Sequence, residues 1–410
     1  MRPVLCNTYD FGGAGTATTR IHRGLRRIGV DSRMLVQIQR GDEPGVTGPD
    51  GTLRRIYSMG RVVTDSLPLR LYGGANDDFS VNWLPDDFRR QLDALEPDVV
   101  HLNWVGEGFF SPTSLGTIHC PIVWRLPDMW AFTGGCHYAD GCERYQDACG
   151  ACPKLDSSTS RDLSRWTWWR KHRAWEDADI TVVGPSNWIA ERARESSLFG
   201  NRRVEVIPNA LDTEVYKPRD SAVGRDLFDL PADARVVLFG AAAPDDPRKG
   251  ADLLREALTE LTDNGAGEDI VQVVFGTSAP EEPLGTGFET RYTGYLNDDQ
   301  SLALLYAAAD VMVVPSRYEG FGQTASEALA CGTPVVAFDA TGPSDIVDHR
   351  ENGYLATPYD PSSLAEGIEW VLADEGRRDR LSEAARTKAV RSYAMETVAE
   401  QYRDLYADIC

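Results

Sequence analysis

Two carboxylates in the second half of the chain lie on either side of an expected helix N-terminus. Residues 311–338, VMVVPSRYEGFGQTASEALACGTPVVAF, predict a buried strand, a glycine-containing loop, a helix that begins near Gly322, and a second buried strand. The first amides of that helix would point outward at the carboxyl end of a parallel strand, which favours an anion. Glu319 precedes the helix and Glu327 lies on it, so that a sugar and a ribose on either side of a diphosphate would each give a carboxylate a hydroxyl donor. The alternative is a helix N-terminus whose acids only complement its dipole.

A pair of cations precedes another helix of the same half. Arg248 and Lys249 follow an expected strand at 235–239, within the segment 241–251, AAAPDDPRKGA, and a helix would begin near Gly250. A planar guanidinium and a compact ammonium could together clamp a diphosphate. Taken alone, the pair is better explained as solvated surface charge. Beside the two carboxylates, a ligand site is the stronger interpretation.

The first half opens with a glycine-rich turn. The segment FGGAGTATTR places Gly12 and Gly13 between the first expected strand and a helix at 14–28, and Gly15 in the first turn of that helix. The spacing departs from the dinucleotide-binding fingerprint, so it is weak support for a phosphate site. Close packing of the helix on the strand would explain the same glycines.

Strand-like and helical segments alternate along the whole chain, which predicts two α/β domains with parallel sheets. A length of 410 residues also exceeds one ordinary hydrophobic core. The segment 206–218, VIPNALDTEVYKP, ends a strand and continues without periodicity, which is typical of a linker. A last helical pattern covers 395–409. The expected strands lie at 2–7, 32–37, 98–103, 122–126, 180–183 and 204–207, then at 235–239, 271–275, 311–314 and 334–337.

Four of these segments resemble one known family. PSRYEGFGQTASEALACGTPVV resembles the donor motif of the retaining glycosyltransferases of family 4, which have the GT-B fold; RKG, the linker and the closing YAMETVAEQYRDLY are similar to that family as well. The resemblance covers nearly the whole chain. It implies two Rossmann-like, doubly wound domains that face each other across a cleft, with a C-terminal helix that crosses back to the first. The acceptor-binding domain would comprise 1–208 and 393–410, with a Cys-rich insertion at 136–152, and the donor-binding domain 209–392.

The resemblance also implies a reaction. A hexose-type sugar would pass with retained configuration from a UDP- or GDP-linked donor to a glycan or lipid-linked acceptor, as in polysaccharide biosynthesis. Arg248 and Lys249 would stabilise the diphosphate leaving group, so that catalysis requires no metal or other cofactor. Glu319 would contact the sugar and Glu327 the ribose. Further donor contacts would come from Gly13, Gly15, Gly320, Phe321, Gly322, Gln323 and Thr324.

One segment departs from the pattern on the acceptor side. Residues 123–138, VWRLPDMWAFTGGCHY, resemble a subgroup whose members often carry His and Asp before Met-Trp, whereas here Pro127 stands at the position of that His. A proline side chain can neither bind a sugar hydroxyl nor move a proton. Asp128 remains as the candidate that orients or deprotonates the acceptor hydroxyl. His101 and His137 are substitute candidates, although buried structural histidines would explain both.

Four of the eight cysteines crowd into seventeen residues. Cys136, Cys142, Cys149 and Cys152 are separated by five, six and two residues, and only the last spacing is typical of zinc knuckles. Four thiolates could close a structural zinc site. Two disulfides, or reduced thiols that pack a loop, are the alternatives.

The net charge and the distribution of apolar residues exclude some classes of function. The formal net charge of −21 disfavours a nucleic-acid partner, because phosphate binding needs a basic face. No leader-like segment or apolar run of membrane length is recognised, so a cytoplasmic enzyme is expected. The segment from Arg165 to Trp175, RWTWWRKHRAW, could still dock at an anionic membrane at the inner membrane face, with Trp168, Trp169 and Trp175 together on one side. A core-facing helix with a solvated basic side is the alternative.

Two other function classes fit the same fold. The protein could hydrolyse, epimerise or phosphorolyse a nucleotide sugar, which the missing histidine keeps open. It could also be a non-catalytic, zinc-stabilised interaction protein. The complete set of Arg248, Lys249, Glu319 and Glu327 argues against the second of these.

Overall fold

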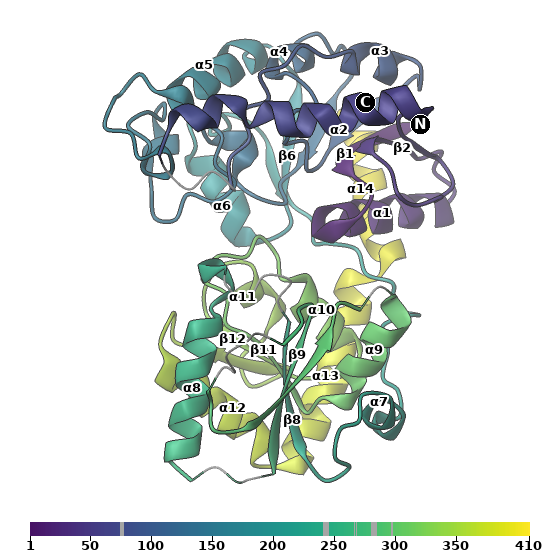
Figure 1. Ribbon diagram of the computed structural model, residues 1–410. Helices are drawn as coiled ribbons and strands as arrows, with labels where there is room; N and C mark the ends of the chain where they lie inside the picture. Colours follow the sequence, from purple (N-terminus) through teal and green to yellow (C-terminus); the bar gives the residue numbers. More distant parts are fainter. Residues whose placement is uncertain (74–77, 241–245, 266, 268, 280–284, 297) are drawn as a thin grey trace. The chain divides into compact units, whose positions relative to one another are not determined.

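The chain folds into two compact units (Figure 1). The computed structural model describes all residues except 74–77, 241–245, 266, 268, 280–284 and 297. The first unit comprises Met1–Ala210 and Val398–Cys410, and the second comprises Leu211–Thr397. Most of the last helix, α14 (Met395–Ile409), therefore belongs with the N-terminal part of the chain.

A seven-stranded parallel sheet forms the centre of the first unit. Its order is β3-β2-β1-β4-β5-β6-β7, so the direction of winding reverses between β1 and β4. Most residues of the central strands are apolar and buried, because helices cover both faces of such a sheet. The strands are β1 (Pro3–Tyr9), β2 (Arg33–Ile38), β3 (Val46–Thr47), β4 (Val99–Leu102), β5 (Ile122–Arg125), β6 (Ile180–Gly184) and β7 (Val204–Val206).

The helices of the first unit begin at polar caps where the sequence supplies them. Asp162 accepts a hydrogen bond from the amide of Arg165 at 3.1 Å, and Ser186 accepts one from Ile189 at 3.4 Å. The helices are α1 (Gly12–Arg27), α2 (Thr52–Asp65), α3 (Phe88–Asp93), α4 (Pro112–Leu115), α5 (Leu163–Trp175), α6 (Asn187–Glu195) and α14, with the 3-10 turns η1 (Leu67–Leu71), η2 (Trp130–Phe132), η3 (Arg144–Gln146) and η4 (Pro153–Leu155).

The second unit is built around a six-stranded parallel sheet. Its order is β10-β9-β8-β11-β12-β13, and here the winding reverses between β8 and β11. The strands are β8 (Arg235–Gly240), β9 (Ile270–Phe275), β10 (Glu289–Gly294), β11 (Val311–Val314), β12 (Val335–Phe338) and β13 (Gly353–Ala356).

Helices cover both faces of the second sheet and form a hydrophobic core on each. One core packs α8 and α12 against the strands, and the other packs α9, α10 and α13 (Figure 1). The helices are α7 (Ser221–Leu227), α8 (Ala251–Asp263), α9 (Asp299–Ala308), α10 (Gln323–Ala330), α11 (Pro343–Ile346), α12 (Pro361–Leu372) and α13 (Glu375–Tyr393), with the 3-10 turn η5 (Pro247–Lys249).

The two doubly wound, Rossmann-like sheets confirm the predicted fold class. All ten expected strands are present within one or two residues of their expected bounds. Three strands were missed: β3 has only two residues, β13 is a short run after a turn, and β10 is a largely polar edge strand. An edge strand need not be apolar, so its pattern is weak.

The helix α5 differs in part from the expectation for 165–175. Trp175 is buried in the core of the first unit rather than grouped with exposed tryptophans. Lys171 is also fully buried, where its ammonium donates to the carbonyl oxygens of Trp130 and, at 3.1 Å, Thr133. One side of α5 therefore faces the core, as the alternative interpretation required. Trp166 and Trp169 lie on the exposed side.

Candidate active site

In the second unit, the predicted cation and carboxylate meet where the sheet order reverses. The turn η5 follows β8, and the loop with Glu319 follows β11. The ammonium Nζ of Lys249 lies 2.6 Å from Oε2 of Glu319. Both side chains are partly exposed. Open α/β sheets bind ligands at the carboxyl ends of the two strands that flank such a reversal, so this edge is the expected place for a ligand.

The loop that carries the two cations is held rigidly. Arg248 is paired with Asp246 through Nε to Oδ1 at 3.1 Å and through a second guanidinium nitrogen to Oδ2 at 2.6 Å. The carbonyl oxygen of Arg248 accepts from the amide of Arg317 at 2.7 Å, which ties this loop to the one after β11. Gly250 has a φ of +68°, and a Cβ there would lie 2.0 Å from the carbonyl oxygen of Pro315, so the turn requires glycine. The residues Ala241 to Asp245 of the predicted segment lie outside the described residues.

The loop before α10 is equally constrained. Gly322 caps the helix with a φ of +104° and contributes no side chain to its first turn. The amide of Gly342 donates to the carbonyl oxygen of Glu319 at 2.9 Å, and a Cβ on Gly342 would lie 2.5 Å from Cα of Phe321. The buried Phe321 ring packs edge-on against Tyr393. The backbone of 319–322 is thus fixed at the N-terminus of α10, where the predicted donor residues Gly320, Gln323 and Thr324 also lie.

Glu327 is the buried carboxylate of this site. It lies on α10, and its Oε2 accepts a hydrogen bond from the hydroxyl of Tyr306 at 3.0 Å. Burial raises the pKa of Tyr306 well above its ordinary value, so the phenol stays protonated and donates. The Tyr306 ring on α9 therefore fixes the direction of the Glu327 carboxylate.

The glycine-rich turn of the first unit has a structural reason for glycine at two positions. Gly12 has a φ of +71° where α1 begins. A Cβ on Gly15 would lie 2.8 Å from the carbonyl carbon of Asp10 and 2.9 Å from the carbonyl oxygen of Tyr9. Close packing of α1 on the end of β1 therefore accounts for Gly15, whereas Gly13 is exposed.

Asp128 and His137, which the sequence offered as separate candidates, form one hydrogen-bonded unit. Oδ2 of Asp128 lies 2.6 Å from Nδ1 of His137 and accepts from Nε1 of Trp104 at 2.7 Å. The other ring nitrogen of His137 lies 2.8 Å from the hydroxyl of Ser80. When Nδ1 donates to the carboxylate, Nε2 can accept from the hydroxyl of Ser80. Pro127 lines the same hollow, of about 190 Å³, as Asp128, Trp104 and His137.

The environment of Asp128 suits it to position other groups. Besides its two partners on Oδ2, its Oδ1 accepts from the amide of Trp130 at 2.8 Å, and the residue is only 7% exposed. The Trp104 ring in turn stacks on His137, with ring centroids 5.2 Å apart. Three donors around one carboxylate fix the imidazole and the indole at the carboxyl edge of the first sheet.

His101 has a different environment from His137. It is fully buried on β4, and its Nδ1 lies 2.6 Å from the hydroxyl of Tyr406 on α14. Its ring also packs against Tyr402. Burial lowers the pKa of His101 to about 3. The structure therefore places this acceptor-side candidate in the core, as a neutral histidine that ties α14 to the sheet.

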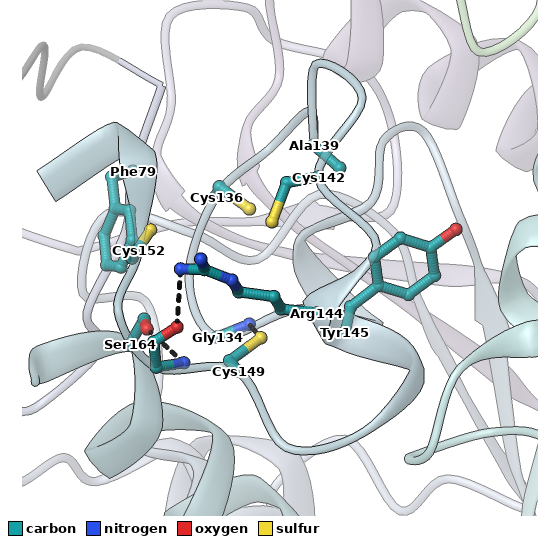
Figure 2. A pocket seen from close by; sticks show the side chains of 11 residues that line it. Phe79, Gly134, Cys136, Ala139, Cys142, Arg144, Tyr145, Cys149, Cys152 and Ser164 are labelled. Atoms are coloured by element: carbon teal, nitrogen blue, oxygen red, sulfur yellow. Dashed lines mark hydrogen bonds between the residues drawn. The ribbon is translucent and has the colours of Figure 1, made fainter. Parts of the chain in front are cut away.

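The four clustered cysteines line one hollow of about 290 Å³ (Figure 2). All four are free thiols, and the amide of Gly134 donates to Sγ of Cys149 at 3.1 Å. Figure 2 shows the Arg144 side chain extending among the sulfur atoms, and its guanidinium donates to the carbonyl oxygen of Gly150 at 3.1 Å. Within the described residues, no group of three or more His, Cys, Asp or Glu side chains could hold a metal ion in this arrangement. Zinc binding stays a prediction.

Comparison with known families identifies the class of protein. Residues 11–215, half of the chain, match the family described as Glycosyltransferase Family 4, and residues 228–388 match the family described as Glycosyl transferases group 1. The chain belongs to the GT-B glycosyltransferases. The chain is 34% identical over 224 residues to the D-inositol 3-phosphate glycosyltransferase of Nocardioides sp., a match that covers 50% of this chain and 48% of the relative. The matched part thus spans about half the length of that relative.

Solved structures share the fold over the whole length of the chain. Sucrose-phosphate synthase from Thermosynechococcus elongatus superposes with a TM-score of 0.70 at 21% identity and covers 100% of this chain and 99% of its own. HepE from Anabaena, solved in complex with UDP-glucose, gives a TM-score of 0.65 at 17% identity and covers 100% of both chains. At these identities the likeness establishes the fold.

Sequence reasoning missed residues that hold the site. Tyr306 orients Glu327, Asp246 binds Arg248, and Trp104 and Ser80 complete the Asp128 and His137 unit. The sequence could have indicated Asp246, since it lies only two residues before Arg248 in a predicted turn. The other three are far from their partners in the sequence, and only the fold brings them together.

Proposed function

We propose that this glycosyltransferase transfers a hexose-type sugar from a UDP- or GDP-linked donor to a hydroxyl group of a glycan or lipid-linked acceptor. The anomeric configuration would be retained, as in family 4, and no divalent metal would take part in catalysis. The observation that carries the proposal is the ion pair of Lys249 with Glu319 at the reversal point of the second sheet, beside the N-terminus of α10. The UDP-glucose complex of HepE, a protein of the same fold, supports the choice of donor class.

The residues around this ion pair match the charge changes of the reaction. As the bond from C1 of the sugar to the diphosphate oxygen breaks, negative charge develops on the leaving diphosphate. Lys249, Arg248 and the dipole of α10 would stabilise that charge in place of a metal. The acceptor oxygen forms the new bond to C1, and its proton leaves on the diphosphate. Glu319 and Glu327 would accept hydrogen bonds from hydroxyls of the sugar and the ribose.

The ion pair prepares the site before the donor arrives. Without a ligand, the charges of Lys249 and Glu319 neutralise each other. Both side chains are partly exposed, so a ligand could still contact them. A donor would give the ammonium a phosphate and the carboxylate a sugar hydroxyl. Each charge would thus exchange one partner for another without being left unpaired.

Ligand-induced thermal stabilisation tests the proposal. A panel of UDP- and GDP-sugars is added to the purified full chain, because a ligand that binds only the folded state stabilises it by about 2.7 kcal/mol at one hundred times its dissociation constant. We expect one nucleotide series to raise the melting temperature, and the shift to disappear in Glu327→Ala. Lys217→Ala, which removes an exposed lysine of the same unit, is the matched control. A folded protein that no nucleotide sugar stabilises would favour a non-catalytic role.

Product analysis distinguishes transfer from the other reactions of this fold. With a stabilising donor, we expect the nucleoside diphosphate to be released mainly when an acceptor is present. Equal release of free sugar without acceptor would indicate a hydrolase, and an altered nucleotide sugar would indicate an epimerase.

A further inference from the structure

The helix α2 of the first unit carries its apolar side chains on the outside. In a helix that packs on a sheet, apolar residues spaced three and four apart face the core. In α2 such residues are each more than half exposed, and Leu53 is 83% exposed. These residues are Leu53, Ile56, Met59 and Val63.

The opposite side of α2 is polar and holds the helix in place. Arg61 is buried and donates through Nε to the carbonyl oxygen of Gly108 at 2.9 Å. Asp65 is also buried, and its Oδ2 accepts from the amide of Val81 at 3.0 Å. The helix is thus anchored by hydrogen bonds rather than by burial of apolar surface.

A hollow of about 970 Å³ lies along the inner side of α2. Arg54, Ser58 and Arg61 of the helix line it, together with residues of β2 and α3. The inner side of α2 therefore faces this hollow and not a hydrophobic core, and the apolar residues of the helix point away from it. Contiguous apolar surface of this kind is uncommon on a monomer and indicates a contact with another surface.

The exposed apolar side chains continue beyond α2. Leu67 and Leu71 of η1 follow it, and Leu71 is 86% exposed. The hydroxyl of Tyr72 accepts from the amide of Leu163 at 3.0 Å, which joins the end of η1 to the start of α5 and its exposed tryptophans. We call this surface the apolar strip; it comprises Leu53, Ile56, Met59, Val63, Leu67, Leu71, Trp166 and Trp169.

The apolar strip is accompanied by positive charge in an otherwise acidic protein. Residues 51–71 contain four arginines and one aspartate, whereas the whole chain has a formal net charge of −21. Arg61 and Asp65 are buried and Arg54 lines the hollow, so the arginines of this segment that lie beside the apolar strip are the exposed Arg55 and Arg70. On α5, the guanidinium of Arg170 lies 4.6 Å from the centre of the Trp166 ring, and that of Arg173 lies 5.5 Å from the Trp169 ring. Apolar side chains flanked by arginine and tryptophan suit the interface of a bilayer.

We propose that the apolar strip docks on a membrane surface that contains anionic phospholipids. Within the described residues no helix is long and apolar enough to span a bilayer, so the contact would be peripheral. A second copy of the chain is the less favoured occupant. Dimers usually bring the same patch of both chains together, and that would set the exposed Arg55 and Arg70 against their own counterparts. Anionic headgroups would neutralise the same arginines.

Vesicle sedimentation with the full chain tests this proposal. We expect the protein to pellet with vesicles of phosphatidylcholine that contain phosphatidylglycerol, and to bind pure phosphatidylcholine much more weakly. Ile56→Ser with Val63→Ser should weaken binding at least about tenfold, because the two side chains would no longer be buried in the interface. Arg55→Ser with Arg70→Ser should weaken binding to anionic vesicles about fivefold or more per arginine and lower its salt dependence.

The control uses exposed apolar residues elsewhere. Val223 and Leu227 of α7 in the second unit are each about half exposed. Val223→Ser with Leu227→Ser should leave vesicle binding unchanged, and the far-UV spectra and melting temperatures of all variants show whether they are folded. Unchanged binding of the α2 variants, or no binding of the wild-type chain, would overturn the proposal. So would a dimer, seen by sedimentation velocity without lipid, that the apolar α2 variant abolishes.

Discussion

Nζ of Lys249 lies 2.6 Å from Oε2 of Glu319, across the point where the second sheet reverses its winding. Seventy residues separate the two side chains in the sequence. They meet because the loops after β8 and β11 leave adjacent strands at the same edge of the sheet. The sheet order therefore sets a cation and a carboxylate side by side before any ligand is bound.

Replacement of Lys249 by alanine should chiefly slow turnover. The ammonium is proposed to act most strongly on the charge that develops on the leaving diphosphate, so kcat should fall about 100- to 1000-fold while the donor KM changes less. The fold should lose less than about 1 kcal/mol, since the ion pair is partly exposed. Steady-state kinetics with the donor identified by thermal stabilisation checks this, with Lys217→Ala as control. Equal losses of binding and turnover in Lys249→Ala and Glu327→Ala would contradict this division of roles.

Tyr306 should act on donor binding through Glu327. Tyr306→Phe removes the hydroxyl that holds Oε2 and keeps the ring, so the fold should lose about 1 kcal/mol. The donor KM should rise several-fold with kcat nearly unchanged. Glu327→Ala should raise the donor KM further. If Tyr306→Phe lowers stability alone and leaves the donor KM as in the wild type, the phenol has only a structural role.

Much of the fold could be predicted from the sequence because buried parallel strands are continuous apolar runs. Met312 and Val336, for example, lie in segments that could only be buried. The candidate donor residues could also be named from the sequence, since they lie in short motifs whose members are close in the chain; their contact with a donor stays a prediction. The motifs with the carboxylates, the cations and the glycines each lie between a predicted strand and a predicted helix, so the sequence alone places them at the end of the strand and the start of the helix.

The rest depended on contacts between distant residues. His137 and Ser80 are 57 residues apart, and no local pattern pairs them. Lys171 is a lysine in a basic segment, which predicts exposure, yet carbonyl groups of another loop surround its ammonium. The helix α2 has an amphipathic period, which does not say which side faces the protein. In the structure the polar side of α2 faces the protein and the apolar side is exposed, which is the reverse of the usual orientation.

The Asp128 and His137 unit should act on the acceptor side. His137→Gln keeps one hydrogen-bond donor but cannot span both Asp128 and Ser80, so the orientation of Trp104 and the wall of the hollow should change. We expect the acceptor KM to rise at least several-fold, while thermal stabilisation by the donor stays as in the wild type. Ser80→Ala, which removes the hydroxyl on the other side of the His137 ring, is the matched variant and should act in the same direction. Loss of donor binding in His137→Gln would place the residue outside the acceptor site.

His101 should make the first unit sensitive to acid. Its pKa is about 3 in the fold, below the ordinary value of 6.5, so the unfolded chain binds more protons between those values. Its contribution to stability is complete above about pH 6.5 and is lost as the pH falls toward 3. At pH 4.5 the loss amounts to about 2–3 kcal/mol.

A variant without the imidazole tests this contribution. Between pH 7.5 and 4.5 the melting temperature of the wild-type chain should fall roughly 5–10 °C further than that of His101→Gln. His119→Gln, which changes an exposed histidine of the same unit, should follow the wild type. Parallel curves for His101→Gln and the wild type would mean that other groups carry the acid sensitivity.

The cysteine hollow should bind one zinc ion per chain. The four thiols already line one cavity, and Lys171 is buried close enough to Cys136 and Cys149 to interact with them electrostatically, so it could offset part of the charge of four thiolates. The guanidinium of Arg144 would have to leave the space among the sulfur atoms. Elemental analysis of protein purified with zinc under reducing conditions should give about one ion per chain, and Cys149→Ser should lower it, whereas Cys410→Ser at the exposed C-terminus should not. Eight titratable thiols after unfolding, with no zinc, would instead identify a loop packed by reduced thiols, and four missing thiols would identify two disulfides.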